Sequence, residues 1–344
     1  MILLRIMLFP FAVLYGWITR FRNWLYDKGV LKSYSFDIPV IAVGNLSVGG
    51  TGKTPQIEYL IRLLSVEYNV AVLSRGYKRK SKGFVLADTN SNAETLGDEP
   101  YQYYRKFQNV QVAVDADRKN GITQLLSQHE KPDVILLDDA YQHRKVKAGF
   151  YILLTSYDDL YADDFMLPTG NLREGRNGAK RADIIIVTKC PAGISEKERN
   201  EISHRLKISN KQALFFTYIS YDDRIYGNND IIPVSDIIAK HKTLVAGIAK
   251  PLPFFEHLRN ERDVLMTFPD HHDFSMEDVS KITEKPDNLI VTTEKDYVRL
   301  IDKLQSDRLF YLPIKTAFVS GQQDFNQKVK SVFLKRGEIT SVKN

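Results

Sequence analysis

The sequence predicts an α/β fold with two domains. One is built on a mainly parallel sheet, and a smaller C-terminal α/β domain is joined to it by a β-hairpin linker. Three observations predict this arrangement: short apolar runs alternate with amphipathic stretches after residue 36, a glycine-rich loop follows the first run, and a stretch of hairpin character interrupts the series near Phe215. A chain of 344 residues is long enough for both domains.

Composition places the chain among ordinary globular proteins and excludes several classes. Its 43% hydrophobic and 26% charged residues argue against disordered and fibrous proteins. The single cysteine, Cys190, excludes a disulfide framework and fits a reducing compartment. A net charge of +6 suits anionic partners such as nucleotides or phospholipids. No recognised nucleic-acid module with a stripe of aromatic and basic residues is present, so we expect no nucleic-acid partner.

Short apolar runs predict the strands of the first domain. Continuous apolar runs separated by helical stretches are typical of parallel strands that are covered on both faces. After the glycine-rich loop, the apolar residues Ile57, Leu60, Ile61 and Leu64 follow the spacing of one helix face, which predicts a covering helix. The predicted strands are Val40–Val43, Val70–Leu73, Val110–Val114, Val134–Leu137, Tyr151–Leu154 and Ile184–Val187.

The pattern changes at Phe215. The stretch FFTYISYDDRIYGNNDIIP alternates apolar and polar residues around an Asn-rich turn, which favours a hairpin. A second α/β series follows, in which Ser275 and Asp278 form a capping pattern for a helix. Its predicted strands are Leu244–Ala246, Val264–Thr267 and Leu289–Thr292, with helices near Phe254–Leu258 and at Met276–Thr283. We therefore expect an N-terminal segment at 1–32, a first domain at 33–214, a linker at 215–237 and a C-terminal domain at 238–344.

The N-terminal segment is unusually apolar. The stretch from Ile6 to Ile18 is almost entirely apolar, but it is shorter than the roughly 20 residues that span a bilayer. Aromatic and basic side chains follow, a mixture favoured at a bilayer surface: Trp17, Arg20, Arg22, Trp24, Tyr26 and Lys28. We expect the segment to associate with a membrane surface. A core helix packed on its own domain is the alternative.

The glycine-rich loop NLSVGGTGKTP, residues 45–55, predicts a phosphate-binding loop. It follows a buried strand and opens a helix, as such a loop requires, although Ser47 stands where the pattern G-x-x-x-x-G-K-[ST] has its first glycine. Backbone N–H groups and the helix N-terminus favour phosphate there, and Lys53 would reach the β- and γ-phosphates. The first domain is therefore predicted to be a P-loop nucleotide-binding domain. The expected nucleotide-binding residues are Ser47, Val48, Gly49, Gly50, Thr51, Gly52, Lys53 and Thr54.

Two adjacent acids predict a magnesium site next to this loop. Asp138 and Asp139 follow the apolar run at 134–137, at the carboxyl edge where open α/β sheets bind ligands. Mg²⁺ keeps several waters and takes few carboxylates, so we expect Asp138 to be the main contact, with the hydroxyl of Thr54. Asp139 alone could instead cap a loop.

Further motifs occur in a specific order along the chain. They are SRGYKR at 74–79, LGDEP at 96–100, DADR at 115–118, DDAYQH at 138–143 and GNLRE at 170–174, followed by AGIAKPLPFF, FPDHHDF and TTEKDYVRL. Together with the phosphate loop, over nearly the whole chain, they closely resemble the tetraacyldisaccharide 4′-kinases of lipid A biosynthesis.

The resemblance implies an activity and its partners. It implies transfer of the γ-phosphoryl group of ATP, with Mg²⁺, to the 4′-hydroxyl of a tetraacylated glucosamine disaccharide 1-phosphate. It also implies two α/β domains, of which the first is P-loop kinase-like, a β-linker hinge and a membrane-associated N-terminal helix. We accordingly expect a protein on the cytoplasmic face of the bacterial inner membrane, held peripherally or monotopically, with no obligate protein partner.

The resemblance also implies a catalytic pair. Asp98 in LGDEP matches the family's base, and His271 in FPDHHDF matches its partner, so that the site would be complete only when the domains close. From the residues alone, Asp98 could cap the helix that follows it, and His272 could replace His271. A metal site at 270–273 is a further reading, although its spacing matches no usual site.

The remaining polar residues of these motifs have weaker predictions. Glu174 and Glu99 are candidates to contact Mg²⁺ or the substrate. Arg118 and Arg173 could clamp phosphates, because a guanidinium matches phosphate geometry. Substrate contacts are also expected from Gln142 and His143. Each could equally be a surface ion-pair partner, and SRGYKR could be a basic lip toward a phosphate or a solvated charge run.

Two other functions compete with the lipid kinase. The stronger is a switch ATPase or GTPase of the GGxGKT type, which hydrolyses nucleotide without a lipid acceptor. Such proteins often have a lysine before the glycine pair, where this chain has Val48, and they need neither an interfacial N-terminus nor FPDHHDF. The other is a membrane scaffold with a degenerate loop, against which Lys53, Thr54 and Asp138 argue.

Overall fold

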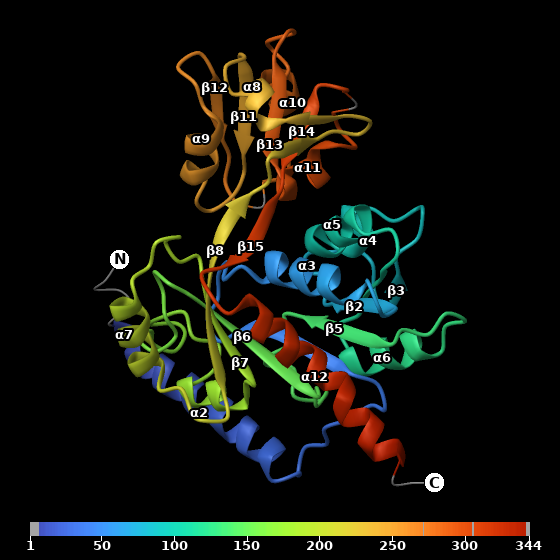
Figure 1. Cartoon of the computed structure of the whole chain (residues 1–344), viewed down its shortest axis with the longest axis vertical. Helices are drawn as coiled ribbons and strands as arrows, with labels where there is room; N and C mark the ends of the chain where they lie inside the picture. Colours follow the sequence, from blue (N-terminus) through green and yellow to red (C-terminus); the bar gives the residue numbers. More distant parts are fainter. Residues whose placement is uncertain (1–6, 271, 305, 342–344) are drawn as a thin grey trace.

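The chain folds into two lobes, each built on its own sheet (Figure 1). The computed structural model describes residues 7–270, 272–304 and 306–341, the last seven as backbone alone. In the described part, the larger lobe contains a nine-stranded sheet and the smaller lobe a six-stranded sheet. This confirms the predicted fold class of a mainly parallel domain with a smaller α/β domain.

The larger sheet has the strand order β15-β8-β7-β6-β1-β5-β2-β4-β3. Its pairs are parallel except at the two edges, where β15 and β3 run antiparallel to their neighbours. The buried strands were predicted because their apolar runs face helices on both sides, and each end differs from the prediction by at most two residues. These strands are β1 (Val40–Asn45), β2 (Val70–Ser74), β4 (Gln111–Val114), β5 (Val134–Asp138), β6 (Phe150–Ser156) and β7 (Ile184–Thr188), with β3 at Val85–Leu86.

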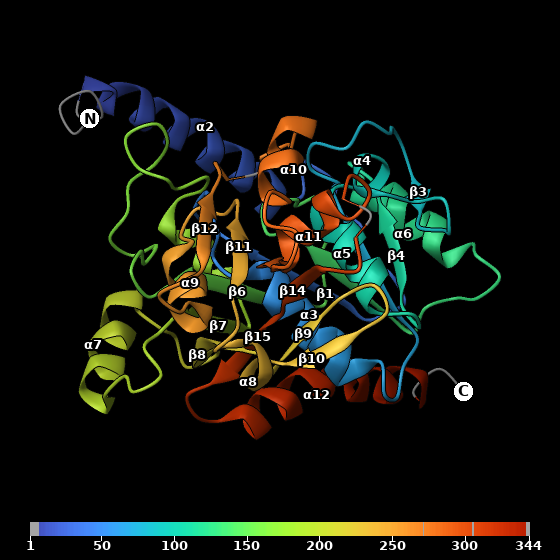
Figure 2. The ribbon, with the colours of Figure 1, turned by 90° about the horizontal axis from the view of Figure 1, so that it is seen from above.

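Helices cover both faces of this sheet. The predicted helix after the glycine loop is α3 (Lys53–Leu64), and its apolar stripe is buried against the strands and against Phe325 of α12 (Gln322–Ser341). Figure 2 shows α12 and the N-terminal helix on opposite sides of the lobe. The other helices of this lobe are α4 (Ala93–Leu96), α5 (Asp98–Lys106), α6 (Arg118–Leu126), α7 (Glu196–Leu206) and a 3₁₀ turn at Arg176–Arg181.

Two antiparallel strands connect the lobes. β8 (Ala213–Tyr221) continues the large sheet beside β7, and β15 (Ile314–Phe318) returns along it from the small lobe (Figure 1). The hairpin expected around the Asn-rich turn also exists, as β9 (Arg224–Tyr226) and β10 (Ile231–Pro233), but it forms the edge of the small sheet. Because β15 comes much later in the sequence than β8, the sequence pattern near Phe215 indicated only β8 as a linker strand. The residue boundaries given to the domains stay predictions.

The small sheet has the order β10-β9-β14-β13-β11-β12, and its last four strands are parallel. The predicted strands and helices are confirmed, including the capping box that Ser275 and Asp278 form at the start of α10. α8, α11 and β14 were not predicted. The elements are β11 (Lys242–Ala246), β12 (Val264–Thr267), β13 (Leu289–Thr293), β14 (Leu309–Leu312), α8 (Val234–Ile237), α9 (Leu252–Leu258), α10 (Met276–Ile282) and α11 (Glu294–Leu300).

The lobes also touch where α5 meets α11. The Nζ atom of Lys106 lies 2.7 Å from a carboxylate oxygen of Glu58 on α3 and 2.7 Å from one of Glu294 on α11. Burial raises the pKa of Glu294, the charge of Glu58 raises it further, and Lys106 opposes both effects. One lysine therefore holds two buried carboxylates of different lobes together, next to the segment that contains Asp98.

The N-terminal helix α2 (Phe9–Asp27) lies on the surface of the large lobe, and only Ala12 and Thr19 of it are buried. The structure therefore contradicts the alternative of a core helix. Within the described residues, no helix combines the length and apolarity needed to cross a membrane. Exposed apolar side chains cover most of α2: Phe9, Phe11, Val13, Leu14, Trp17, Ile18, Phe21 and Trp24.

Candidate active site

The glycine-rich loop runs from the end of β1 to the start of α3. Gly49 and Gly52 have φ angles of 111° and 81°, a region that side chains with a Cβ rarely adopt. Ser47 has no such angle; its backbone forms an antiparallel bridge with Leu172. A serine is therefore compatible with the position where the usual pattern has glycine. The eight residues expected to bind nucleotide form this loop and the first turn of α3.

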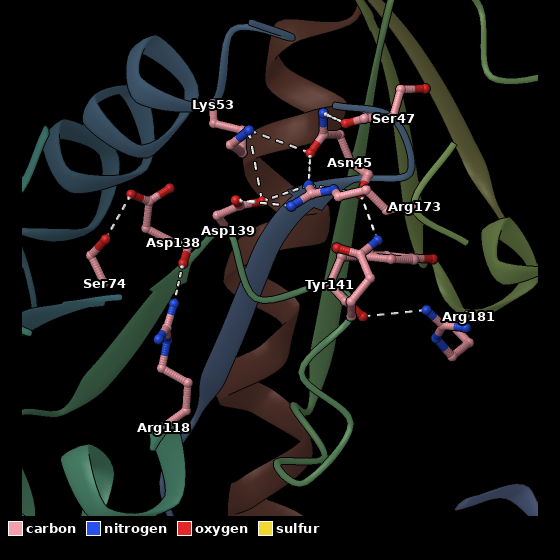
Figure 3. A network of polar contacts seen from close by, with 11 residues as sticks. Asn45, Ser47, Lys53, Ser74, Arg118, Asp138, Asp139, Tyr141, Arg173 and Arg181 are labelled. Atoms are coloured by element: carbon pink, nitrogen blue, oxygen red, sulfur yellow. Dashed lines mark hydrogen bonds and ion pairs between the residues drawn. The ribbon is translucent and has the colours of Figure 1, made fainter. Parts of the chain in front are cut away.

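Strand pairing brings the two acids beside the loop. Val43 of β1 is in register with Asp138 of β5, so the carboxyl ends of these strands meet at one edge of the sheet. The Nζ atom of Lys53 lies 3.7 Å from Oδ1 of Asp139 and 3.3 Å from Oδ1 of Asn45. Figure 3 shows Lys53, Asp139 and Arg173 converging on this point.

Arg173 completes the cluster. Its Nη1 and Nη2 atoms donate to the two carboxylate oxygens of Asp139, at 3.2 and 2.9 Å, and Nη2 also donates to the side chain of Asn45. Burial opposes ionisation of Asp139, but Lys53 and Arg173 outweigh it and lower its pKa to about 2. Asp139 therefore carries a negative charge that fixes two cations beside the glycine loop.

Asp138 has the opposite environment. Its side chain is 5% exposed, and burial with the nearby charge of Asp139 raises its pKa to about 6. Oδ2 accepts a hydrogen bond from the hydroxyl of Ser74 at 3.3 Å, whereas Oδ1 is buried and has no hydrogen-bond partner in the described part of the chain. A buried carboxylate oxygen without a partner is what a bound cation would satisfy.

The residues at this site suit Mg²⁺ better than a metal ion whose ligands are all protein side chains. Among the described residues, no group of three or more His, Cys, Asp or Glu side chains is arranged to hold a metal ion. Mg²⁺ usually takes one or two carboxylates and leaves its other positions to water and phosphate oxygens. Asp138 and the hydroxyl of Thr54, in the first turn of α3, offer such a small set.

Glu174 has partners other than the glycine loop. Its Oε2 accepts a hydrogen bond from Arg181 at 2.9 Å, and its Oε1 accepts one from Asn23 of α2 at 2.7 Å. Next to it, the carbonyl oxygen of Arg173 accepts a hydrogen bond from Tyr15 of α2 at 3.1 Å. Glu174 thus attaches the N-terminal helix beside the cluster, and its predicted contact with Mg²⁺ is not supported by these bonds.

Three candidate substrate residues are engaged with the backbone of the site or buried beside it. Arg118 is 2% exposed and donates to the carbonyl oxygens of Asp115 and Asp138, at 2.7 and 3.2 Å (Figure 3). Gln142 donates to the carbonyl oxygen of Asn45 at 2.8 Å. Burial and the charge of Arg118 lower the pKa of His143 to about 4, so its ring is neutral at physiological pH. These contacts favour support of the strand ends over direct contact with an acceptor.

Asp98 lies where the lobes meet. The Nε atom of Arg299, on α11, donates to Oδ2 of Asp98 at 3.0 Å, and Nη2 donates to the same oxygen. The N-cap of α5 is Gly97, and no side chain caps this helix, so the structure contradicts the capping role considered for Asp98. The adjacent Glu99 lies 3.8 Å from Lys295 of α11.

The predicted partner of Asp98, His271, lies outside the described residues, and its role stays a prediction. The alternative, His272, makes a 3.0 Å contact with Asp278 at the start of α10. Asp270 contacts Lys295 at 3.5 Å, and Asp273 pairs with Lys303. The described members of the segment 270–273 thus have separate partners, which does not favour a metal site there.

Sequence reasoning missed several members of the site. Asn45 ends β1 and contacts Lys53 and Arg173, Ser74 ends β2 and contacts Asp138, and Arg299 reaches Asp98 from the other lobe. Ser74 directly follows the predicted strand Val70–Leu73, and Asn45 comes two residues after the predicted strand Val40–Val43, so their positions at the carboxyl edge were a usable signal. Arg299 stands in TTEKDYVRL, but no local pattern connects it with Asp98.

Comparison with known proteins decides the family. The family described as tetraacyldisaccharide-1-P 4'-kinase, LpxK, matches residues 4–334. The chain belongs to this family. A tetraacyldisaccharide 4'-kinase of Flavobacterium johnsoniae is 68% identical, with 95% of this chain and 96% of the relative covered. One of Bacteroides thetaiotaomicron is 47% identical, with 94% and 91% covered.

A solved member of the LpxK family supports the same assignment. The crystal structure of LpxK from Aquifex aeolicus in complex with ATP is 32% identical to this chain, covers 96% of it and 99% of itself, and has a TM-score of 0.79. The similarity therefore extends over both lobes. Membership of a kinase family along nearly the whole chain does not favour the switch ATPase alternative.

Proposed function

We propose that this LpxK-family protein is an ATP-dependent lipid kinase that transfers the γ-phosphoryl group of ATP to the 4′-hydroxyl of tetraacyldisaccharide 1-phosphate, in the biosynthesis of lipid A and lipopolysaccharide. The family match over residues 4–334 carries this proposal. The cluster of Lys53, Asp138 and Asp139 at the carboxyl edge of a parallel sheet supports it, because that edge is where phosphoryl donors bind in such folds.

The glycine loop holds the triphosphate. Its backbone N–H groups and the positive end of α3 favour the phosphate charge, and Lys53 neutralises the oxygens between the β- and γ-phosphates. Asp139 keeps Lys53 and Arg173 beside the loop, so both cations are in place before the transition state forms. Arg173 then stabilises the charge of the transferred group.

Asp138 and the hydroxyl of Thr54 would hold Mg²⁺, whose other positions would be left to phosphate oxygens and water. The ion would supply neutralisation of the phosphate charge when it is bound. The raised pKa of Asp138 reflects the cost of a buried negative charge with few partners, and a cation removes that cost. Ser74 donates a hydrogen bond to Oδ2 and so orients the carboxylate, and Oδ1 would be the oxygen left to contact the ion.

Asp98 acts as the base for the acceptor. It takes the proton of the 4′-hydroxyl while the new O–P bond forms and the bond to the leaving ADP breaks, with His271 as its partner. Arg299 holds Oδ2 from the other lobe, so the carboxylate is positioned only when α5 and α11 are together. Closure of the lobes would thereby complete the site and exclude water.

The helix α2 attaches the enzyme to the cytoplasmic surface of the inner membrane, where the acylated acceptor resides. Its exposed aromatic and aliphatic side chains include Trp17, which is 68% exposed, and Phe21, which stacks on Trp24. Hydrogen bonds from Tyr15 and Asn23 fix this helix to the segment 173–174, which lies beside the glycine-rich loop. The lipid surface and the phosphoryl donor are thus brought to the same edge of the large lobe.

A product assay tests the proposal. Purified protein, MgATP and tetraacyldisaccharide 1-phosphate in neutral micelles should give a bisphosphorylated lipid, with the new phosphate at the 4′-position by ³¹P NMR and mass spectrometry. Lys53→Ala should abolish the product, because it removes the charge beside the phosphates. As a matched control, Lys80→Gln changes an exposed lysine that pairs with Glu94 and should leave product formation intact. A new phosphate elsewhere on the lipid would contradict the proposal.

A further inference from the structure

Two ion pairs join the helices α5 and α11 at opposite ends. At one end Asp98, the first residue of α5, pairs with Arg299 in the last turn of α11. At the other end Lys106, the last residue of α5, pairs with Glu294, the first residue of α11. The helices lie side by side but belong to different lobes, as Figure 1 and Figure 2 show. The ion pair at the proposed base thus has a counterpart that the proposed mechanism does not use.

Apolar side chains of both lobes fill the space between the two ion pairs. Tyr101 of α5 and Val298 of α11 belong to one buried cluster, together with Leu96 and Val114. Their side chains are 5% and 3% exposed. Close packing of this kind transmits a displacement instead of absorbing it. A shift of α11 at Glu294 would therefore also move Arg299.

Two buried carboxylates share Lys106. Its Nζ atom lies 2.7 Å from Oε2 of Glu58 and 2.7 and 2.8 Å from the two carboxylate oxygens of Glu294. Glu58 also accepts hydrogen bonds from Arg62 at 2.9 Å and from Gln102 at 2.8 Å. Among the residues that the structure describes, Lys106 is the one cation that pairs with Glu294. Glu294 is therefore the less compensated carboxylate of the two, although its side chain is only 7% exposed.

The groups around Glu294 favour its neutral form. Burial and the charge of Glu58 raise its pKa from 4.5 to about 7, although Lys106 opposes them. Burial also raises the pKa of Tyr311 well above its usual value, so this neighbour stays neutral. The titratable and charged groups that face Glu294 are Glu58 and Arg62 of α3, Lys106 of α5, and Tyr311 of β14 with Tyr226 of β9 and Tyr297 of α11 behind it.

Separation of the lobes would change the environment of Glu294 alone. Glu58, Arg62 and Lys106 all belong to the large lobe and would stay together, whereas Glu294 would be exposed to water. Its pKa would then return toward 4.5, so closing the lobes takes up a proton. The contribution of Glu294 to closing is fully present below pH 4.5 and is lost as the pH rises through about 7.

We propose that Lys106 and Glu294 form a proton-linked latch between the lobes, which takes up one proton at Glu294 on closing and thereby sets the position of Arg299 against Asp98. This inference rests on the proposed function, because Asp98 is the base only there. Lys106 and Glu294 are positioning residues that act through α11. The rate of phosphoryl transfer would then depend on pH through a group in the interface between the lobes.

Energy transfer between dyes on the two lobes measures closing. Exposed positions for labelling are Lys131→Cys on the large lobe and Glu284→Cys on the small lobe, and Cys190 is buried. With Glu294 present, the equilibrium constant for closing should fall about tenfold between pH 6 and pH 8, as a pKa of 4.5 in the open state and about 7 in the closed state requires. Glu294→Gln has the shape of the protonated side chain, so its closing should not change with pH.

A matched control and a kinetic measurement complete the test. Glu277→Gln removes an exposed carboxylate of the small lobe that pairs with Lys281, and it should keep the pH dependence of closing. The ratio of kcat for Glu294→Gln to kcat for the unmodified enzyme should rise by up to about tenfold between pH 6 and pH 8, with an unchanged KM for ATP. Titrations of other groups cancel in this ratio, and a merely structural role of Glu294 would not change it with pH.

Closing that depends on pH equally in Glu294→Gln and in the unmodified protein would overturn the inference, as would closing of the unmodified protein that is independent of pH. A ratio of kcat values that is the same at both pH values would also overturn it, because the latch would then not act on the base. The energy-transfer measurement needs no acceptor. Proton-linked closing in a protein that does not phosphorylate the lipid would therefore support the latch and contradict the proposed function.

Discussion

Replacement of Asp138 by asparagine should stabilise the nucleotide-free protein at neutral pH. The side chain is buried, and its pKa is raised from 3.8 to about 6, so the folded state opposes its ionisation. A raised carboxyl pKa means that stability is fully present below pH 3.8 and is lost as the pH rises toward 6 and above. Asp138→Asn keeps a group that can accept the hydrogen bond from Ser74 and removes the charge.

The size of the effect follows from the pKa difference. A rise from 3.8 to about 6 corresponds to about 3 kcal/mol at pH 8, and about half of that is present at pH 5. For a chain of 344 residues with an unfolding entropy of about 2.1 cal/mol/K per residue, 3 kcal/mol raises Tm by about 4 °C. Scanning calorimetry of both proteins at pH 5 and pH 8, without nucleotide, measures it.

The neighbouring acid provides the control. The pKa of Asp139 is lowered to about 2 because Lys53 and Arg173 outweigh burial, so Asp139→Asn should lower Tm above pH 4. MgATP should raise the Tm of the unmodified protein and have much less effect on Asp138→Asn. A lower Tm for Asp138→Asn at pH 8, or a change independent of pH, would refute the reasoning that this carboxylate is held at a cost for cation binding.

Three further changes test the contacts between lobes and with the membrane. Arg299→Gln should lower kcat by roughly 10-fold or more with an unchanged KM for ATP, and Arg299→Lys should retain part of the kcat that Arg299→Gln loses. Steady-state kinetics measures both variants. An unchanged kcat in Arg299→Gln would show that Arg299 does not position the base. Lys106→Met should destabilise the protein by about 3 kcal/mol. The loss of stability should be larger at pH 8 than at pH 6, because the raised pKa of Glu294 rises further without the lysine. A loss of stability that calorimetry finds to be independent of pH would contradict this. Trp17→Glu with Phe21→Glu should release the protein from vesicles in flotation assays while activity on micellar substrate persists, and retained binding would exclude α2 as the anchor.

The parts of the fold that the sequence predicts are those encoded locally. β1, the glycine loop and α3 follow from one apolar run, a set of glycines and one helical stripe. The pairing of β15 with β8 was not predictable in this way, because Ile314 and Tyr221 are brought together only by the whole small lobe. The hairpin pattern after Phe215 is real, but its strands join another sheet.

The site shows the same limit. Residue types identified Asp138 and Asp139 as a pair, but they could not show that one carboxylate has a pKa near 6 and the other near 2. That difference arises from Lys53 and Arg173, which approach only Asp139 closely. Likewise, Asp98 and Arg299 are 201 residues apart, and their contact depends on how α11 docks on α5.

The coupling between nucleotide consumption and lipid phosphorylation tests the central claim most directly. ADP and phosphorylated lipid should form in equal amounts with the acceptor present, and ADP formation should nearly stop when the acceptor is omitted. Lys53→Ala and Asp98→Asn should each reduce both products together, because the same cluster binds the donor and the same base activates the acceptor. Release of inorganic phosphate at an undiminished rate without the lipid would contradict the account, because water would then be the acceptor.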